Sequence, residues 1–235
     1  MRINKFLALS GIASRRAAEK LVLDGKVKIN GRIVTELATE VDEHRDDVTV
    51  DGVKAVLPDV FSYFMFHKPK GCVTTASDDR GRKTVFDYIH LKERVFPVGR
   101  LDYDSEGLLL FTNDGELAAK LTHPSHEIPK TYLVKVEGEM KESELAVLRN
   151  GVMMSGGEKA GKCRVKLLDI KNSVSRLEIT LFEGKNREIR RMMAAIGREV
   201  AFLKRIAIGA LRLGGLSRGE YRPLTEAEVA YLKSL

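Results

Sequence analysis

A glycine-flanked turn around Asp102 constrains this chain more than any other segment. It opens with Gly99 and Arg100 and leads through Gly107 into an apolar run at residues 108–111. Glycine adopts backbone angles that other residues disfavour, so the two glycines permit a tight turn, and the apolar run anchors it in a core. Arg100 and Asp102 are then left facing outward. This placement suits a reactive carboxylate on a rigid support.

The composition is that of a globular protein with no membrane segment. The 235 residues are 43% hydrophobic and 31% charged, which allows one or two domains. No apolar run approaches the roughly 20 residues that span a bilayer, and the charged N-terminus does not resemble a signal peptide. Cys72 and Cys163 lack the spacing of a disulfide framework or a zinc site. We therefore expect a cytoplasmic protein in a reducing compartment.

Basic residues are concentrated in two blocks. Residues 1–33 carry eight Lys and Arg against two acidic residues, whereas residues 34–60 carry two against eight. A second basic block, residues 185–222, carries ten against three. Two separate cationic surfaces indicate an extended polyanionic ligand such as RNA.

The first basic block predicts a small module of two helices and a hairpin. Ile3, Phe6 and Leu7 have helical spacing, and a second helix over residues 15–23 begins after a Ser14 cap. Two short strands follow, over residues 26–30 and 32–34, joined at Asn30-Gly31, which tolerates the backbone of a tight turn.

The basic side chains of this module are predicted to contact RNA. Arg15 and Arg16 lie at a predicted helix N-terminus, where the backbone amides also attract phosphate. The patch is extended by Lys5, Lys26, Lys28 and Arg32. A merely solvated basic face is the alternative, and the segregation of charge favours RNA binding over it.

Three motifs of this module match a known RNA-binding fold. Residues 2–7 (RINKFL), 13–19 (ASRRAAE) and 25–31 (GKVKING) resemble the αL-type module that is named after a small-subunit ribosomal protein. The resemblance implies binding of structured RNA through its shape and phosphates, with little reading of bases.

The remainder of the chain predicts an α+β catalytic domain. We place the boundary so that residues 1–57 form the RNA-binding module and residues 58–235 the second domain. An apolar strand at 62–67 comes first, followed by expected strands at 95–98, 108–112, 130–137, 162–170, 175–182 and 200–208. Expected helices are 115–121, 141–149, 187–196 and 226–233, the last with a Thr225/Glu228 capping box. This order favours a mixed, mostly antiparallel sheet.

Three further segments accompany the Asp102 turn. They are residues 68–71 (KPKG), 130–134 (KTYLV) and 182–192 (FEGKNREIRRM). In this order they resemble the RsuA/RluB-type ribosomal RNA pseudouridine synthases, which isomerise uridine to pseudouridine. Residues 79–87 and 112–115 are more similar to the RluB-type enzymes of the large subunit. The resemblance implies modification of one specific uridine in 23S rRNA, with 16S rRNA as the alternative.

The resemblance also implies the catalytic residues. Asp102 is the essential aspartate, which either attacks the sugar or the uracil or removes a ribose proton. Arg190 matches the arginine that pairs with this aspartate and keeps it ionised. Tyr132 matches the tyrosine that packs against the base, and its phenol is able to relay the C5 proton. No metal or organic cofactor is expected, because the isomerisation involves no redox change.

A uridine within a stem must leave the base stack to reach a buried aspartate. Arg100, directly before the turn, is expected to enter the vacated stack or to hold flanking phosphates. Lys68, Lys70, Lys185 and Arg187 are expected to line the same cleft.

Each assignment has a simpler alternative. An aspartate in a turn is most often a turn former, and a tyrosine in a strand is most often a core residue. Asp102, Asp104 and Glu106 also imitate the opening of a calcium loop, but Asn113 stands at its closing position, and we expect no metal. The alternative from another functional class is a noncatalytic ribosome-assembly factor. We predict an rRNA pseudouridine synthase that acts as a monomer.

Overall fold

The computed structural model describes residues 1–235, and these form two compact units. The first comprises Met1–Ser62 with Leu91–Val95 and Thr112–Gly115, and the second comprises Tyr63–His90, Phe96–Phe111 and Glu116–Leu235. The boundary predicted near residue 58 lies just before the change from one unit to the other. None of the helices combines the length and the apolar character that a bilayer crossing requires.

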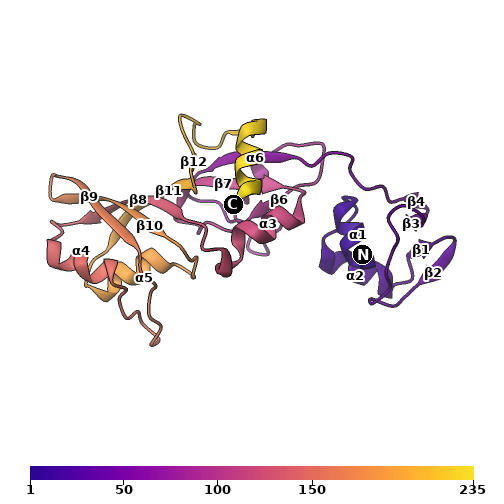
Figure 1. The fold of residues 1–235 in the computed structure, drawn as a ribbon, viewed down its shortest axis with the longest axis horizontal. Helices are drawn as coiled ribbons and strands as arrows, with labels where there is room; N and C mark the ends of the chain where they lie inside the picture. Colours follow the sequence, from indigo (N-terminus) through magenta and orange to yellow (C-terminus); the bar gives the residue numbers. More distant parts are fainter. The chain divides into compact units, whose positions relative to one another are not determined.

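The first unit has the predicted helices and hairpin. Helices α1 (Ile3–Leu9) and α2 (Arg15–Leu23) pack beside a sheet of order β2-β1-β3-β4 (Figure 1). Ser14 caps α2 by accepting a hydrogen bond from the backbone N–H of Ala17 at 3.2 Å. The strands are β1 (Val27–Ile29), β2 (Arg32–Val34), β3 (Val48–Val50) and β4 (Val53–Lys54). Strands β3 and β4 were not predicted, although Asp51-Gly52 between them is a hairpin signal.

The second unit is built on a nine-stranded sheet. Its main order is β13-β5-β7-β11-β8-β10-β9, with β12 paired to β11 and β6 paired to β7. The strands are β5 (Tyr63–Lys68), β6 (Phe96–Val98), β7 (Glu106–Thr112), β8 (Lys130–Glu137), β9 (Arg164–Lys171), β10 (Val174–Leu181), β11 (Val200–Ile208), β12 (Leu211–Arg212) and β13 (Tyr221–Pro223). Most of the pairs are antiparallel, and β7 with β11 is parallel. The α+β class with a mixed, mostly antiparallel sheet is therefore confirmed.

Helices and short 3-10 turns connect these strands. They are η1 (Val85–Asp87), α3 (Gly115–Thr122), η2 (Pro124–His126), α4 (Glu142–Arg149), α5 (Glu188–Ala195) and α6 (Glu226–Ser234). The predicted capping box of α6 is present, since Thr225 and Glu228 exchange side-chain to backbone hydrogen bonds.

Two apolar cores flank the parallel pair of strands. One packs α4 and α5 against β8, β9 and β10, with residues such as Leu148, Met193 and Ile179 fully buried. The other packs α3 and α6 against β5 and β7, around Met65 and Leu108 (Figure 1). The loops that enter β7 and β11 are thus anchored on both sides.

Gly107 permits the close approach of β7 and β11. Its φ is +117°, and a Cβ at this position would lie 2.2 Å from the carbonyl oxygen of Arg205 on β11. Only glycine fits this backbone, because any side chain would collide with the neighbouring strand. The glycine identified in the sequence therefore fixes where the Asp102 turn meets the central sheet.

Candidate active site

A buried lysine holds the turn that carries Asp102. The ammonium of Lys68, at the end of β5, donates hydrogen bonds to the carbonyl oxygens of Asp102 at 2.9 Å, Ser105 at 2.9 Å and Pro69 at 3.1 Å. The residue is 0% exposed, and burial lowers the pKa of its ammonium. One side chain thus holds the backbone of the aspartate itself and of Ser105, three residues further along the turn.

Two further contacts fix the same turn. The hydroxyl of Thr74 donates to the carbonyl oxygen of Leu101 at 2.8 Å, and the backbone N–H of Gly71 donates to that of Tyr103 at 2.8 Å. These contacts occupy the main chain, which leaves the carboxylate of Asp102 free to face the other way. Its side chain is 28% exposed.

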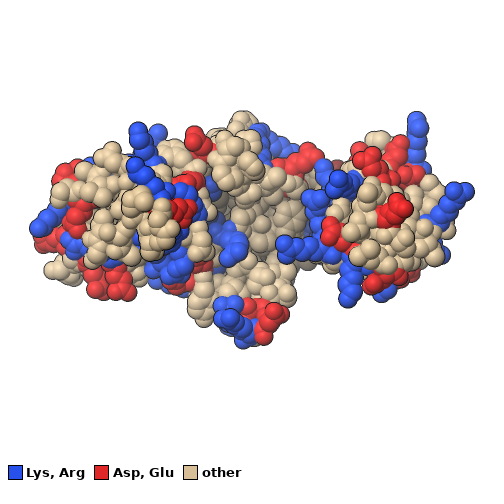
Figure 2. Space-filling view, turned by 90° about the horizontal axis from the view of Figure 1, so that it is seen from below, with Lys and Arg blue, Asp and Glu red and all other residues tan.

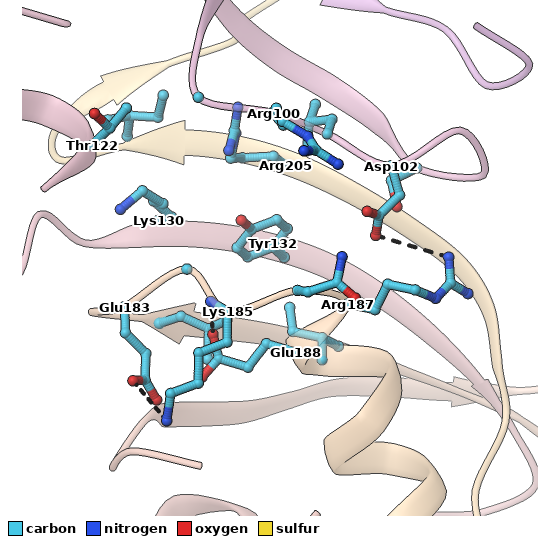
Figure 3. Close-up of a pocket in the computed structure, with 18 of the residues that line it drawn as sticks. Arg100, Asp102, Thr122, Lys130, Tyr132, Glu183, Lys185, Arg187, Glu188 and Arg205 are labelled. Carbon is cyan, nitrogen blue, oxygen red and sulfur yellow. Dashed lines mark hydrogen bonds and ion pairs between the residues drawn. The ribbon is translucent and has the colours of Figure 1, made fainter. Parts of the chain in front are cut away.

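The carboxylate of Asp102 borders a cleft of about 500 Å³. The walls come from the Asp102 turn, from β8 and β11, and from the segment that leads into α5 (Figure 3). In the close-up, Arg100 and Asp102 lie on one wall, Tyr132 lies between the walls, and Glu183, Lys185 and Glu188 lie opposite. This volume falls within the roughly 300–1,000 Å³ of sites that hold small molecules.

The arginines around Asp102 are arranged differently from the expectation. Arg187 reaches Asp102 at 4.0 Å and forms a two-pronged pair with Asp104, with both N–O distances 3.1 Å. Arg190 also pairs with Asp104, at 3.2 Å, and donates to its backbone oxygen at 3.1 Å. The predicted pairing of Arg190 with Asp102 is therefore wrong for this structure. Asp104, two residues further along the turn, is the anion that Arg190 contacts.

Asp104 is consequently a firmly ionised counter-ion. Burial alone would raise the pKa of its carboxyl group, but the hydrogen bonds from Arg187 and the charge of Arg190 outweigh burial and lower the pKa below its ordinary value. The carboxylate lies directly beside the wall of the cleft that Arg187 forms. It thus offsets positive charge that is otherwise available to a phosphate.

Tyr132 lies on the central strand β8, where its ring is only partly buried. Its register partners are Arg205 on β11 and Ile179 on β10, and it lines the cleft. A strand supported on both sides presents an aromatic face more rigidly than a loop does. The ring of Tyr132 is therefore held firmly at the wall of the cleft.

Two cations on adjacent strands line the cleft without a carboxylate partner. Arg205 is 3% exposed, and its Nε donates to the carbonyl oxygen of Leu108 at 2.7 Å, while Nη2 is buried with no partner. Lys130 donates only to the carbonyl oxygen of Ile128, at 3.1 Å. Burial, and then the nearby charge of Arg205, lower the pKa of Lys130. Neither residue was predicted from its sequence context, although an arginine at an inward-facing position of a predicted strand was a usable signal.

A pair of glutamates closes the opposite wall. Glu188 is buried and accepts a hydrogen bond from the backbone N–H of Lys185 at 3.0 Å. Burial, together with the neighbouring carboxyl of Glu183, raises the pKa of Glu188 to about 8. Glu183 keeps its charge, since its carboxylate accepts from the backbone of Gly161 and pairs with Lys185 at 3.0 Å. Neither acid was predicted to line the site, because glutamates among charged residues are usually solvated.

The cationic residues predicted to line the cleft have different positions. Arg100 is exposed and lines the cleft, and Lys185 and Arg187 line it as well. Lys70 is exposed with its ammonium over the ring of Phe202, 4.9 Å from the centroid, and does not line it. The prediction that Lys68 contacts RNA is wrong, because its ammonium is enclosed by three backbone carbonyls. Basic side chains border a hollow in the middle of the face seen in Figure 2.

The predicted phosphate-binding residues of the first unit lie on its surface. Arg15 and Arg16 are exposed at the start of α2, and Lys28 and Arg32 are exposed on the hairpin. Lys26 is exposed and lies 4.0 Å from Asp51. Lys5, on α1, is half-buried. Both arginines of the helix start are therefore accessible to a phosphate.

Known families account for both units. Residues 62–195 match the family of RNA pseudouridylate synthases, and residues 1–48 match the S4 domain. The chain belongs to the RNA pseudouridylate synthase family. Its resemblance to RsuA/RluB-type enzymes is thereby confirmed, as is the N-terminal RNA-binding module. The chain is an RNA pseudouridine synthase, an enzyme that isomerises uridine within RNA.

Relatives match over their whole length. The "Ribosomal large subunit pseudouridine synthase B" of Bacillus subtilis is 45% identical, across 100% of this chain and 96% of the relative. An RNA pseudouridine synthase of Aquifex aeolicus is also 45% identical, across 99% and 93% of the two chains. A crystal structure of a pseudouridylate synthase superposes with a TM-score of 0.72 at 32% identity and covers 99% of both chains. Both units of the chain are thus covered by these relatives.

Proposed function

We propose that this RNA pseudouridine synthase converts one uridine of large-subunit ribosomal RNA to pseudouridine, with Asp102 as the catalytic carboxylate. The observation that carries the proposal is a half-buried carboxylate, on a turn fixed by Lys68, that borders a nucleotide-sized cleft beside Tyr132. The large subunit is favoured because the Bacillus subtilis protein named for that substrate matches the entire chain. Assembling ribosomes in the cytoplasm are the expected place of action.

The chemistry requires that the target base leave its stack. The bond between C1′ of the ribose and N1 of uracil must break, and C5 must then bond to C1′. Asp102 borders the cleft, which supports its role in attacking the sugar or base or in taking a proton. Tyr132 lines the same cleft, which supports its role in packing on the base. Arg100 is exposed and lines the cleft, which supports its role in filling the gap that the extruded nucleotide leaves.

The S4 unit is proposed to hold the substrate through phosphates. Arg15 and Arg16 combine their charges with the amide end of α2, which favours phosphate over any base edge. Binding through such contacts weakens steeply with salt. The catalytic unit supplies the chemistry, and the S4 unit supplies affinity for structured RNA.

Modification mapping tests the proposal. Ribosomal RNA from cells that lack the gene is incubated with the protein, and carbodiimide primer extension locates the pseudouridines in both subunits. We expect one new pseudouridine in large-subunit rRNA with the wild type and none with Asp102→Asn. Asp169→Asn is the matched control, because this carboxylate pairs with Arg176 at 2.8 Å and does not line the cleft.

Each contrary outcome addresses a separate part of the proposal. A modified site in small-subunit rRNA overturns the choice of subunit alone. Activity that survives Asp102→Asn overturns the assignment of the site. Tight RNA binding by the wild type without any modification supports a noncatalytic assembly factor instead.

A further inference from the structure

We propose that Arg205 and Lys130 are catalytic residues that stabilise the negative charge on uracil when its bond to the ribose breaks. The inference rests on the proposed assignment of the Asp102 cleft as the active site. Both cations line this cleft, and neither takes part in the ion pairs that Asp102 and Asp104 form with other arginines.

Arg205 carries a donor with no partner. Nε is occupied by the carbonyl oxygen of Leu108 at 2.7 Å, whereas Nη2 is buried and unpaired. A buried guanidinium that lacks a counter-ion is costly, so it is retained only where it is used or compensated. Arg205 lines the cleft that contains Asp102 and Tyr132, and the residue opposite it on β8 is Tyr132 itself. Its charge therefore lies beside the place where the base packs.

Lys130 reinforces this charge. It stands two residues before Tyr132 on β8, so its side chain shares the face of Tyr132, and it lines the same cleft. Its hydrogen bond is to the backbone oxygen of Ile128, and neither it nor Arg205 forms an ion pair with a carboxylate. Glu188 is the carboxyl group whose charge would act on Lys130, and burial raises the pKa of Glu188 to about 8, so that this group is protonated at neutral pH. The proximity of the two cations raises the energy of each of them in the empty cleft. An anion between them would relieve that repulsion.

The reaction generates such an anion. When the bond from C1′ to N1 breaks heterolytically, its electron pair remains on uracil, where it is shared by N1, O2 and O4. The ribose is left electron-poor at C1′, and Asp102 then either bonds to C1′ or removes the C2′ proton. C5 of the rotated uracil afterwards bonds to C1′. On the first route this bond displaces the Asp102 oxygen from C1′, and on the second route Asp102 returns the proton to C2′. The C5 proton then leaves, and N1 gains a proton. The sum is an isomerisation, so no oxidant, reductant or co-reactant is required.

The positive charges act most strongly on the separated base. Neutral uridine gains little from two cations, whereas anionic uracil gains much, and this difference accelerates the step. Asp102 and Asp104 already interact with Arg187 and Arg190, which leaves Arg205 and Lys130 for the base. The two sets of charges thus have separate tasks in one cleft.

The test compares two leaving groups. A short RNA that carries the uridine mapped above is prepared with uridine or with 5-fluorouridine at that position. Fluorine makes the uracil anion more stable, so its departure depends less on the protein. Single-turnover rates of glycosidic cleavage are measured for the wild type, Arg205→Gln and Arg205→Lys, with enzyme in saturating excess. Gln retains a donor for the oxygen of Leu108 without the charge, and Lys retains the charge.

We expect Arg205→Gln to slow conversion of uridine by roughly 10²–10³-fold, the effect of removing one oxyanion donor. The slowing should be clearly smaller with 5-fluorouridine, and Arg205→Lys should recover part of the rate. Lys204→Gln, the adjacent residue of β11, does not line the cleft and should stay within about twofold of the wild type on both substrates. Lys130→Gln should show the same dependence on the leaving group, and it tests the proposal even if Arg205→Gln does not fold.

Equal slowing of both substrates by Arg205→Gln and Lys130→Gln overturns the inference, because a structural role is indifferent to the leaving group. Unchanged rates overturn it too. These results are read only where the wild type converts the RNA and Asp102→Asn does not. If Asp102→Asn is active, the site assignment itself has failed.

Discussion

Lys68→Met tests whether one buried ammonium organises the Asp102 turn. Methionine keeps most of the volume of the side chain but removes its three donors to the carbonyl oxygens of Pro69, Asp102 and Ser105. Each buried carbonyl left unpaired costs about 1–3 kcal/mol. Relief from burying the charge offsets part of this sum, since burial lowers the pKa of Lys68. We expect a net loss of about 3–5 kcal/mol, a large part of the 5–15 kcal/mol that is typical for a domain.

The assay for this substitution is urea unfolding followed by far-UV circular dichroism, together with single-turnover conversion of RNA. Lys70→Met is the matched control, because its exposed ammonium lies over Phe202 and a contact of this kind contributes about 0.5–1 kcal/mol. If the free energy of unfolding of Lys68→Met lies within about 1 kcal/mol of that of the control, and RNA is converted equally fast, the Lys68 hydrogen bonds do not hold the turn.

Three further predictions concern other parts of the molecule. Gly107→Ala should destabilise the protein strongly or prevent folding, because its Cβ would lie 2.2 Å from the backbone oxygen of Arg205, and thermal unfolding measures this loss. Glu188 has a pKa near 8 when folded and about 4.5 when unfolded, so the folded state binds the extra proton and stability falls as pH rises through this window. The free energy of unfolding of Glu188→Gln should therefore exceed that of the wild type by on the order of 3 kcal/mol at pH 8 and by little at pH 5. If the two proteins differ by the same amount at both pH values, the raised pKa is contradicted. Replacing both Arg15 and Arg16 by Gln should weaken RNA binding and lower the slope of log Kd against log salt concentration by the equivalent of about two phosphate contacts. An unaltered slope would exclude these arginines as phosphate ligands.

Regular elements could be predicted closely because their patterns are local. The strands over 130–137 and 200–208 and the helix over 15–23 have the predicted bounds. Their alternation or helical spacing extends over enough residues to be visible. Strand β13 has three residues and no such pattern, so its pairing with the distant strand β5 decides whether it forms.

The charges of the site were harder to predict. Lys68 has the sequence context of an exposed lysine, and its burial depends on carbonyls that lie more than 30 residues away along the chain. The two acids of the turn are separated by one residue, so spacing does not tell which of them faces Arg190. Arg205 is buried because β7 passes beside it, a neighbour that its own strand pattern does not reveal. Sequence motifs thus located the cleft, whereas the pairing within it required the fold.

The position of Asp104 leads to a last prediction about RNA binding. Its carboxylate interacts with both Arg187 and Arg190 and has a lowered pKa, so it stays ionised at neutral pH and repels phosphate at the cleft. Asp104→Asn keeps an acceptor for Arg187 but removes the charge. We expect RNA to bind about three- to fivefold more tightly, as fits an interaction of about 0.5–1 kcal/mol at a partly exposed site.

Titration of RNA binding at two salt concentrations measures this effect, and Asp169→Asn makes the same change of net charge outside the cleft. The gain with Asp104→Asn should exceed that of Asp169→Asn and shrink at high salt, because screening weakens both the lost repulsion and the new attraction. Equal affinities for the two variants would show that net charge alone matters. A weaker affinity for Asp104→Asn would show instead that Asp104 positions the arginines for RNA. The affinity lost with that positioning would then exceed the affinity gained by removing the repulsion of phosphate.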